Sequence, residues 1–182
     1  MSKVNKKEII IGVTGSIAAY KACDIIRGLK KYGYNTTVIM TKEAEEFVTP
    51  LLMSDISENK AYTDMFGPVR EWDIKHVSLA QAADLILIAP ATANIIAKLA
   101  LGICNDLLTC TVLASRAPVL IAPAMNDNMY SHRSTQDNIK KLKSFGYKFI
   151  GPVKGKLACG TEGIGHIADV EEIIREAKKT LS

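Results

Sequence analysis

The sequence predicts an α/β protein built on a doubly wound parallel sheet. Short apolar runs alternate along the chain with longer stretches of helical periodicity, which is the pattern of β-α-β units. The chain has 182 residues, of which 48% are hydrophobic and 23% charged, and a soluble domain of this size buries roughly two-thirds of its surface on folding. These features favour a three-layer sandwich of the Rossmann or flavodoxin-like type.

The candidate strands are the short apolar runs Glu8–Val13, Asn35–Met40, Asp84–Ala89, Pro118–Ala122 and Tyr147–Ile150. Between the first two, residues 17–32 have helical periodicity and Gly33 follows as a C-terminal stop, so this stretch forms a complete β-α-β unit. Further helices are predicted at Val77–Ala83, Ala91–Leu101, Asp106–Ala114, Ser134–Phe145 and Val170–Leu181, the last with Asp169 as its N-cap.

Two long segments, Thr49–Asp73 and Gly151–Gly165, fit neither period. Long irregular stretches in a compact α/β domain are more often functional loops than structural ones. No internal repeat, linker or domain boundary is visible. The sequence therefore predicts one domain over residues 1–182.

Composition and charge argue against several classes of protein. The net charge of +4 comes from dispersed lysines without interleaved aromatic residues, which disfavours nucleic-acid binding and is compatible with a small anionic substrate. The apolar run Ile9–Val13 is too short for a signal-peptide core, and no stretch approaches the roughly 20 apolar residues needed to span a bilayer. The four cysteines show no CxxC spacing, so we expect no metal site, no disulfide framework and a cytoplasmic location.

The first strand runs directly into Gly12-Val-Thr-Gly-Ser-Ile-Ala-Ala19, where the next helix begins. The free N–H groups of a helix start let Gly15–Ile17 cradle a phosphate, but a tight turn needs glycine without any ligand, and the loop alone leaves both explanations open. The glycine spacing and the end of the second strand differ from a dinucleotide site, which favours a mononucleotide. Thr41 is equally well explained as the N-cap of a helix starting near Ala44.

The third and fourth strands run into Ala89-Pro-Ala-Thr-Ala-Asn94 and Ala122-Pro-Ala-Met-Asn126. Ligands of doubly wound sheets bind outside the carboxyl ends of the strands, so small residues beside Thr92, Asn94 and Asn126 leave room for a flat cofactor. Proline and asparagine also form ordinary turns, but that explanation accounts poorly for the alanines.

Two further side chains are candidates for chemistry. His76 lies at the expected start of a helix, whose dipole favours a neutral imidazole that accepts a proton or a hydrogen bond, and a capping or surface role is the ordinary alternative. Cys159 lies in Gly155–Gly165, a loop with four glycines, whereas free cysteines are generally buried. Burial is the better explanation for Cys23 and Cys110.

Together these segments resemble the flavin-containing cysteine decarboxylase superfamily. The resemblance covers nearly the whole chain, and several motifs in the same order are far more specific than any one of them. The motifs are Gly15-Ser-Ile-Ala-Ala19, His76-Val77, Pro90-Ala-Thr-Ala-Asn94, Asn105-Asp-Leu-Leu108, Pro123-Ala-Met-Asn-Asp-Asn-Met129 and Leu157-Ala-Cys-Gly160.

The resemblance implies FMN-dependent decarboxylation of 4′-phosphopantothenoylcysteine to 4′-phosphopantetheine in coenzyme A biosynthesis. Flavin would oxidise the thiol-bearing carbon to a thioaldehyde, CO2 would depart into that electron sink as an enethiol forms, and the enethiol would then be reduced again. Cys159 would supply the proton for this last step. The cycle would end with no net redox change.

The same resemblance implies the roles of individual residues. His76 acts beside the flavin, Asn126 holds the substrate carboxylate, and these two with Cys159 are the catalytic residues. The substrate also contacts Met129 and a covering loop within residues 151–165, through Lys156, Leu157 and Ala158. FMN contacts Gly15, Ser16, Ile17, Thr41, Thr92, Ala93, Asn94 and Ala124.

The resemblance also predicts assembly. Members of the superfamily form trimers, often assembled further into dodecamers, with flavin sites at subunit contacts, and many bacterial members carry a phosphopantothenate–cysteine ligase domain. Three residues depart from the common pattern: His166 replaces an arginine, Tyr130 a tryptophan and Ile95 a threonine. Histidine cannot reproduce the bidentate, permanently charged fork of arginine, which weakens the expected anchoring of a phosphate or of the loop.

Three alternatives remain. A peptidyl-cysteine decarboxylase of lantibiotic biosynthesis leaves the enethiol unreduced and generally lacks the Leu-Ala-Cys-Gly loop, so Cys159 argues against it. A prenylating flavin enzyme fits the first loop but not the Pro-Ala-Met-Asn segment. A non-catalytic flavin-binding regulatory subunit is disfavoured by the intact His76, Asn126 and Cys159.

Overall fold

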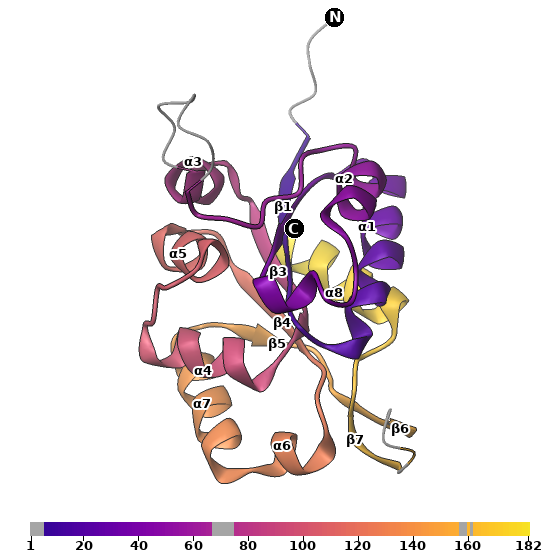
Figure 1. Ribbon diagram of the computed structural model, residues 1–182, viewed down its shortest axis with the longest axis vertical. Coiled ribbons are helices and arrows are strands. Elements are labelled where there is room, and N and C mark those ends of the chain that lie inside the picture. Colours follow the sequence, from indigo (N-terminus) through magenta and orange to yellow (C-terminus); the bar gives the residue numbers. More distant parts are fainter. Residues whose placement is uncertain (1–5, 67–74, 157–159, 161) are drawn as a thin grey trace, which may run out of the picture.

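The computed structural model describes residues 6–66, 75–156, 160 and 162–182, which include a five-stranded sheet in the order β2-β1-β3-β4-β5 (Figure 1). All neighbouring strands of this sheet are parallel. The strands are β1 (Glu8–Val13), β2 (Asn35–Met40), β3 (Leu85–Ala91), β4 (Val119–Pro123) and β5 (Lys148–Phe149). The chain changes direction across the sheet between β1 and β3, which creates the switch point at which such sheets bind ligands.

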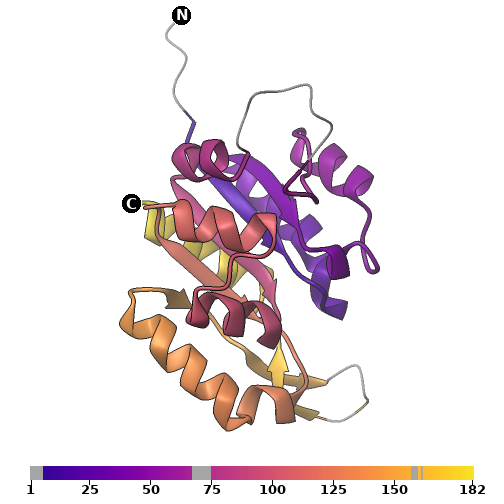
Figure 2. The same cartoon turned by 60° about the vertical axis from the view of Figure 1, so that its left-hand side comes forward.

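Helices cover both faces of the sheet, as Figures 1 and 2 show. One face carries α1 (Lys21–Lys31), α2 (Pro50–Ser57) and α8 (Val170–Leu181). The other carries α3 (Lys75–Ala82), α4 (Ala93–Leu101), α5 (Leu107–Ala114) and α7 (Arg133–Ser144). The predicted three-layer α/β fold is thereby confirmed.

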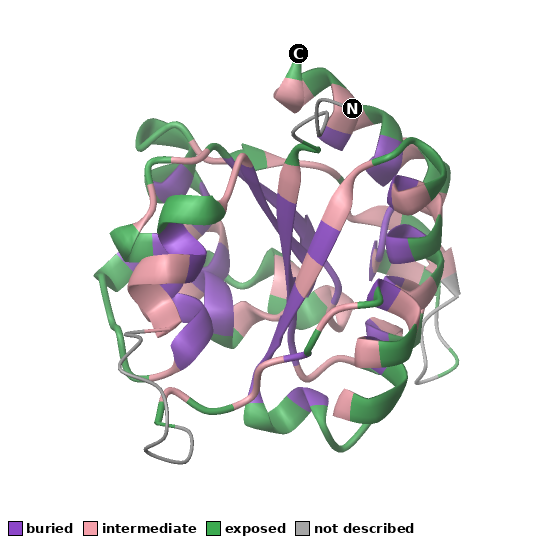
Figure 3. Ribbon diagram, turned by 90° about the horizontal axis from the view of Figure 1, so that it is seen from above, coloured by how far each residue is buried: buried purple, intermediate pink, exposed green. Residues whose placement is uncertain are grey.

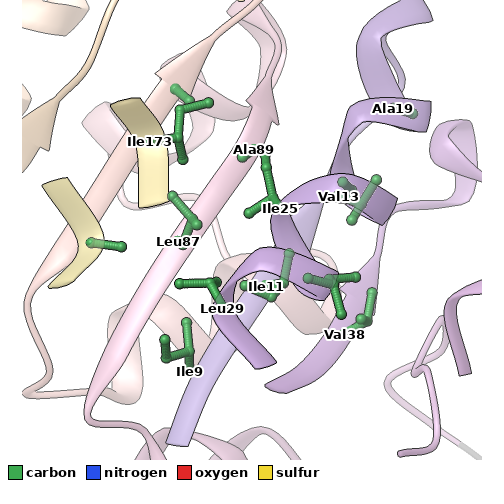
Figure 4. Packing of buried hydrophobic residues seen from close by; sticks show 14 of the residues in the cluster. Ile9, Ile11, Val13, Ala19, Ile25, Leu29, Val38, Leu87, Ala89 and Ile173 are labelled. Atoms are coloured by element: carbon green, nitrogen blue, oxygen red, sulfur yellow. The ribbon is translucent and has the colours of Figure 1, made fainter. Parts of the chain in front are cut away.

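The alternation of side chains along β1 divides the hydrophobic core into two halves. Ile9 and Ile11 belong to the half beneath α1 and α8, and Figure 4 shows them in one cluster with Ile25 of α1 and Ile173 of α8. Ile10 belongs to the half beneath α3, α4, α5 and α7. Because both faces are covered, the central strands are buried almost throughout, whereas exposed residues lie on the outer surfaces of the helices (Figure 3).

The prediction that residues 49–73 are irregular was wrong, because α2 lies within them. Thr49 caps this helix, its hydroxyl accepting a hydrogen bond from the Leu52 N–H at 3.2 Å. Only Met53 and Ser57 of α2 are buried, while Leu51 is 80% exposed. The helix therefore has no apolar stripe at helical spacing from which periodicity could identify it.

The prediction that residues 151–165 are irregular was also wrong. Strands β6 (Val153–Lys156) and β7 (Glu162–His166) form a separate antiparallel sheet. Gly155 pairs with Gly163 in this sheet. Glycine is depleted in strands because it has no side chain to pack, so strands built around it give no apolar alternation in the sequence.

The remaining differences are local. The stretch 17–32 divides into the 3₁₀ helix η1 (Ile17–Tyr20) and α1, and the short helix α6 (Asp127–Ser131) was not predicted. Thr41 occupies the N-cap of η2 (Lys42–Ala44), although its side chain makes no capping hydrogen bond. Within the described ranges, every helix is too short or too polar to cross a membrane.

Candidate active site

A cavity of about 600 Å³ lies at the carboxyl ends of β1, β3 and β4, where the switch point predicts a ligand site. Its walls come from the loop after β1 with η1, the ends of β3 and β4, α6 and the end of β7. The lining residues are Gly15, Ser16, Ile17, Ala18, Tyr20, Lys21, Thr92, Ala124, Met125, Asn126, Met129, Gly165, His166 and Ile167. The volume is typical of a small-molecule or cofactor site.

Thr14 ties the loop after β1 to the end of β3. Its buried hydroxyl donates to the Pro90 carbonyl at 2.8 Å and accepts from the Thr92 N–H at 3.1 Å. Ser16 adds a link to the end of β4, because its hydroxyl donates to the Ala124 carbonyl at 3.2 Å. Thr14 was not predicted as a site residue, since nothing in the neighbouring sequence signals a contact with residues more than seventy positions away.

Two glycines allow the walls of the cavity to approach closely. A Cβ atom at Gly15 would lie 2.5 Å from the Cβ of Glu43 and 3.1 Å from its carbonyl carbon. A Cβ atom at Gly165 would lie 2.1 Å from the carbonyl oxygen of Met125, whose N–H donates to the Gly165 carbonyl at 3.0 Å. Strand β7 is thus held directly against the segment after β4, and neither position has room for a side chain.

Asn126 is fixed in the wall of the cavity by its role as the N-cap of α6. Its Oδ1 accepts hydrogen bonds from the N–H groups of Asn128 at 3.0 Å and Met129 at 3.4 Å. The predicted substrate residues Asn126 and Met129 therefore lie on one turn of chain, and both line the cavity.

The charges of the lining suit an anion. Lys21 and His166 line the cavity, and none of the lining residues that the structure describes is an aspartate or glutamate. The Lys21 Nζ lies 5.3 Å from the centre of the Tyr20 ring, and Nδ1 of His166 lies 2.8 Å from the Ile167 carbonyl oxygen. Metal ligation is not indicated, because the described part of the chain has no cluster of three His, Cys, Asp or Glu side chains able to hold an ion.

The predicted FMN residues that line this cavity are Gly15, Ser16, Ile17, Thr92 and Ala124. Thr41, Ala93 and Asn94 are not part of the lining. Ala93 and Asn94 form the first turn of α4, whose N-cap Thr92 accepts from the Ile95 N–H at 3.3 Å. The Oγ1 of Thr41 is buried and has no hydrogen-bond partner in the part of the chain that the structure describes.

His76 lies away from the cavity. It is in the first turn of α3, which is at the upper end of the molecule in Figure 1, whereas η1, α6 and β7 are at the lower end. Figure 2 shows the same separation. Within one chain, His76 and Asn126 are therefore not brought together.

The predicted covering loop lies mostly outside the described residues. Leu157, Ala158 and Cys159 are among the residues that the structure does not describe, and Lys156 ends β6 just before them. The strands on either side are held together by antiparallel pairing, in which Lys156 is opposite Glu162. This pairing holds the described ends of β6 and β7, Lys156 and Glu162, next to each other.

The Asn105-Asp-Leu-Leu motif has a structural role in the described chain. Asp106 is the N-cap of α5, forms a capping box with Thr109 and pairs with the Lys98 ammonium at 2.8 Å. Burial by itself raises the pKa of the Asp106 carboxyl, but hydrogen bonds from Lys98 and Thr109 outweigh it and hold the pKa below its usual value.

The cysteines outside the loop are free thiols. Cys23 and Cys110, which were predicted to be buried, are only half-buried, and desolvation raises the pKa of both. Cys104 is exposed, and its carbonyl oxygen lies 3.4 Å from the Cys110 Sγ. None of the three lines the cavity.

Sequence comparisons extend over the whole chain. The Flavoprotein family matches residues 1–182. The coenzyme A biosynthesis bifunctional protein CoaBC of Bacillus subtilis is 47% identical over 176 residues, which cover 97% of this chain but only 43% of that protein. The probable phosphopantothenoylcysteine decarboxylase of Streptococcus mutans is 44% identical over 177 residues, which cover 96% of this chain and 99% of that protein. The chain thus spans less than half of the bifunctional relative and nearly all of the other.

Solved structures share the fold. A PPC decarboxylase mutant complexed with pantothenoylaminoethenethiol has a TM-score of 0.87 and 28% identity, with 96% of this chain and 97% of that chain covered. The FMN-dependent cysteine decarboxylase SpaF has a TM-score of 0.84 and 30% identity, with 98% of this chain and 99% of that chain covered.

Proposed function

Because the chain belongs to the Flavoprotein family, we propose that it binds FMN and decarboxylates 4′-phosphopantothenoylcysteine to 4′-phosphopantetheine in coenzyme A biosynthesis. The observation that carries the proposal is the cavity at the switch point, whose walls bring together Ser16, Thr92 and Asn126 from three of the predicted motifs. The relative from Streptococcus mutans, which this chain matches over nearly its full length, supports the choice of substrate.

The residues present fit FMN. Gly15, Ser16 and Ile17 line the cavity where the loop after β1 enters η1. A side chain at Gly15 would displace this loop, because its Cβ atom would lie 2.5 Å from the Cβ of Glu43. Among the described residues the buried Thr41 hydroxyl has no hydrogen-bond partner, as is expected of a group that hydrogen-bonds a ligand. We assign the flavin phosphate to Gly15–Ile17 and the ring to the strand ends near Thr92 and Ala124.

FMN when bound supplies a reversible two-electron acceptor, which cysteine itself lacks. The protein must then orient the substrate carboxylate and return a proton. Asn126 suits the first task because its capping bonds fix its side chain in the cavity wall. Cys159, in the segment between β6 and β7, suits the second because a thiol is a far stronger acid than a hydroxyl.

His76 reaches a flavin in this scheme only from a second copy of the chain, since α3 and the cavity lie at opposite ends of one molecule (Figure 1). We therefore propose a homotrimer, with dodecamers as a further level of assembly, in which each site combines Asn126 of one subunit with His76 of another. Two inactive variants, His76→Asn and Asn126→Asp, should then complement each other. Refolded as a mixture, they should recover about a quarter of wild-type activity by random assortment. No recovery despite mixed oligomers would place both residues in one subunit.

The relation to the bifunctional relatives suggests a partner. They contain a region equivalent to this chain within a protein more than twice as long. We propose that this chain works with a phosphopantothenate–cysteine ligase, as a domain of the same polypeptide or as a separate protein, because that reaction makes its substrate.

The decisive test is to purify the protein, identify its released cofactor by mass and measure CO2 release from phosphopantothenoylcysteine. We expect FMN and stoichiometric 4′-phosphopantetheine. Cofactor released as FAD or NAD, or the absence of flavin absorbance, would overturn the cofactor assignment. Flavin binding without CO2 release would instead favour a regulatory subunit.

Cys159→Ser separates the proposal from a peptidyl-cysteine decarboxylase. With oxidation and CO2 loss intact but no efficient proton donor, the variant should release a single burst of CO2 under anaerobic conditions. Its product should be the enethiol, about two mass units lighter than 4′-phosphopantetheine because two hydrogens are not returned. Wild-type amounts of ordinary product from the variant would show that Cys159 is not the donor.

A further inference from the structure

We propose that Thr14 is a positioning residue for FMN and that its buried hydroxyl sets the spacing between the loop after β1 and the end of β3. The inference rests on the proposed function, because FMN is the ligand assigned to this cavity. It goes beyond that function because Thr14 is not one of the described lining residues and acts through Gly15–Ile17 and Thr92, which are.

The sheet opens between β1 and β3 at the cavity. The pairing of β1 with β3 reaches Gly12, which is opposite Ile88, whereas on its other side β1 stays paired with β2 as far as Val13 and Met40. Strand β3 extends beyond this pairing to Ala91. Backbone N–H and C=O groups in this stretch that point toward β1 need other partners, because a buried polar group left unpaired costs free energy.

The hydroxyl of Thr14 is the partner of two such groups. It donates to the Pro90 carbonyl at 2.8 Å and accepts from the Thr92 N–H at 3.1 Å. These groups flank Ala91, whose own carbonyl accepts from the Ala124 N–H at 3.0 Å on the β4 side. A hydroxyl can donate and accept at once, so this one side chain replaces the N–H and C=O that a further residue of β1 would supply to the ladder.

Because a side chain completes the ladder, the main chain of β1 is free to turn out of the sheet. The Ser16 N–H donates to the Thr14 carbonyl at 2.8 Å, which closes the turn. The turn carries Gly15–Ile17 to the cavity wall, to which Thr92 also belongs. Thr14 thereby links the segment that we assign to the flavin phosphate with the strand end that we assign to the flavin ring.

The burial of Thr14 makes this link sensitive to the loss of one oxygen atom. The residue is 1% exposed, so water does not take the place of a missing hydroxyl. Valine would keep the shape of the side chain but leave the Pro90 carbonyl and the Thr92 N–H without this partner, and they recover partners only if the strand end moves. Thr92 is also the N-cap of α4, so such a movement shifts the start of that helix. A site whose walls are no longer preorganised binds its ligand more weakly.

FMN binding to the apoprotein tests the proposal without relying on activity. Apoprotein is titrated with FMN by fluorescence quenching, at a temperature well below the melting temperature of every variant. We expect Thr14→Val to raise the Kd about tenfold to a hundredfold, the effect of losing two buried hydrogen bonds that hold the site. Thr14→Ser keeps the hydroxyl and should bind FMN within about threefold of the wild type.

Thr111→Val is the matched control. The Thr111 hydroxyl is also buried and donates to the Leu107 carbonyl at 2.8 Å within α5, and neither residue lines the cavity. The control should lower the melting temperature, because it too loses a buried hydrogen bond, but it should leave the Kd for FMN unchanged.

Thr14→Cys keeps the proposal testable if Thr14→Val does not fold. A thiol is a weaker donor and acceptor than a hydroxyl, so the Kd of this variant should lie between those of the serine and valine variants. Amide hydrogen exchange of the apoprotein gives a second readout, in which the Thr92 N–H should exchange about tenfold faster or more in Thr14→Val or Thr14→Cys than in Thr14→Ser.

Two results would overturn the proposal. The first is that Thr14→Val, or Thr14→Cys if valine does not fold, binds FMN as tightly as Thr14→Ser and shows the same exchange at Thr92. The second is that Thr111→Val loses as much affinity for FMN as Thr14→Val, which would make the loss a general effect of destabilisation. Failure of the wild-type apoprotein to bind FMN would instead refute the proposed function.

Discussion

Replacing Asn126 by aspartate introduces a charge into the cavity with little change in the fold. In the structure, Oδ1 of Asn126 accepts the N–H groups of Asn128 and Met129 at the start of α6. Aspartate is as good an N-cap as asparagine, and its charge interacts favourably with a helix N-terminus. The variant should therefore keep α6 and bind flavin normally.

The expected loss of activity follows from the proposed contact with the substrate carboxylate. Two negative charges about 4 Å apart repel by about 4 kcal/mol at the effective dielectric constant of about 20 found near protein surfaces. Asn126 is half-buried in a cavity partly open to water, so about 3 kcal/mol is a reasonable value, equivalent to a reduction in kcat/KM of two to three orders of magnitude. Asn126→Ala removes the amide without adding a charge and should be less damaging to substrate binding.

The assay is single-turnover CO2 release with flavin absorbance and melting temperature measured on the same preparations. Asn126→Ala should lose about 1 kcal/mol of stability because α6 loses its cap, whereas Asn126→Asp should not. Equal activity of Asn126→Asp and the wild type would refute the placement of the substrate carboxylate. A large loss of stability in Asn126→Asp would refute the capping argument instead.

Three further predictions concern the surroundings of the site. Asp106→Ala should lower the free energy of unfolding by about 2 kcal/mol in urea denaturation, against less than about 0.5 kcal/mol for the exposed Asp137→Ala. Because the pKa of Asp106 is lowered on folding, the stability lost in Asp106→Ala should be greatest above about pH 5 and should shrink as the pH falls below about 4. Gly15→Ala should yield a folded protein that is purified with little flavin absorbance, and retention of stoichiometric flavin would contradict the close approach described. Iodoacetamide should modify the exposed Cys104 faster than Cys110, whose pKa burial raises, and peptide mapping by mass spectrometry would reveal the reverse order.

Hydrophobic patterning was sufficient to predict the helices and strands that bury a continuous face. The bounds of β1, β2 and α8 agree with the prediction, because the strands contain short runs of buried residues and α8 has an apolar face at helical spacing. Helix α2 was missed since its exposed leucines lie on the face that periodicity expects to be polar. Helix α6 has five residues and buries none of them, so it has no pattern to detect.

The location of the site was predictable for a different reason. The carboxyl ends of parallel strands lie at one edge of a sheet, so loops that follow β1, β3 and β4 are neighbours in any fold of this class. Gly15, Thr92 and Ala124 could therefore be grouped without coordinates. The contacts that hold those loops together could not, because the hydrogen bonds of Thr14 and the approach of Gly165 to Met125 depend on how distant segments meet.

His76 marks the limit of reasoning from a single chain. Patterning places it correctly at the start of a helix, and the order of motifs relates it to the flavin, yet α3 lies at the far end from the cavity. His76 belongs to a predicted motif but not to the cavity of its own chain. A second copy of the chain that completes the site would explain this. That explanation makes assembly a condition of activity, so a variant that dissociates the oligomer should lose decarboxylation even with every residue of the cavity intact.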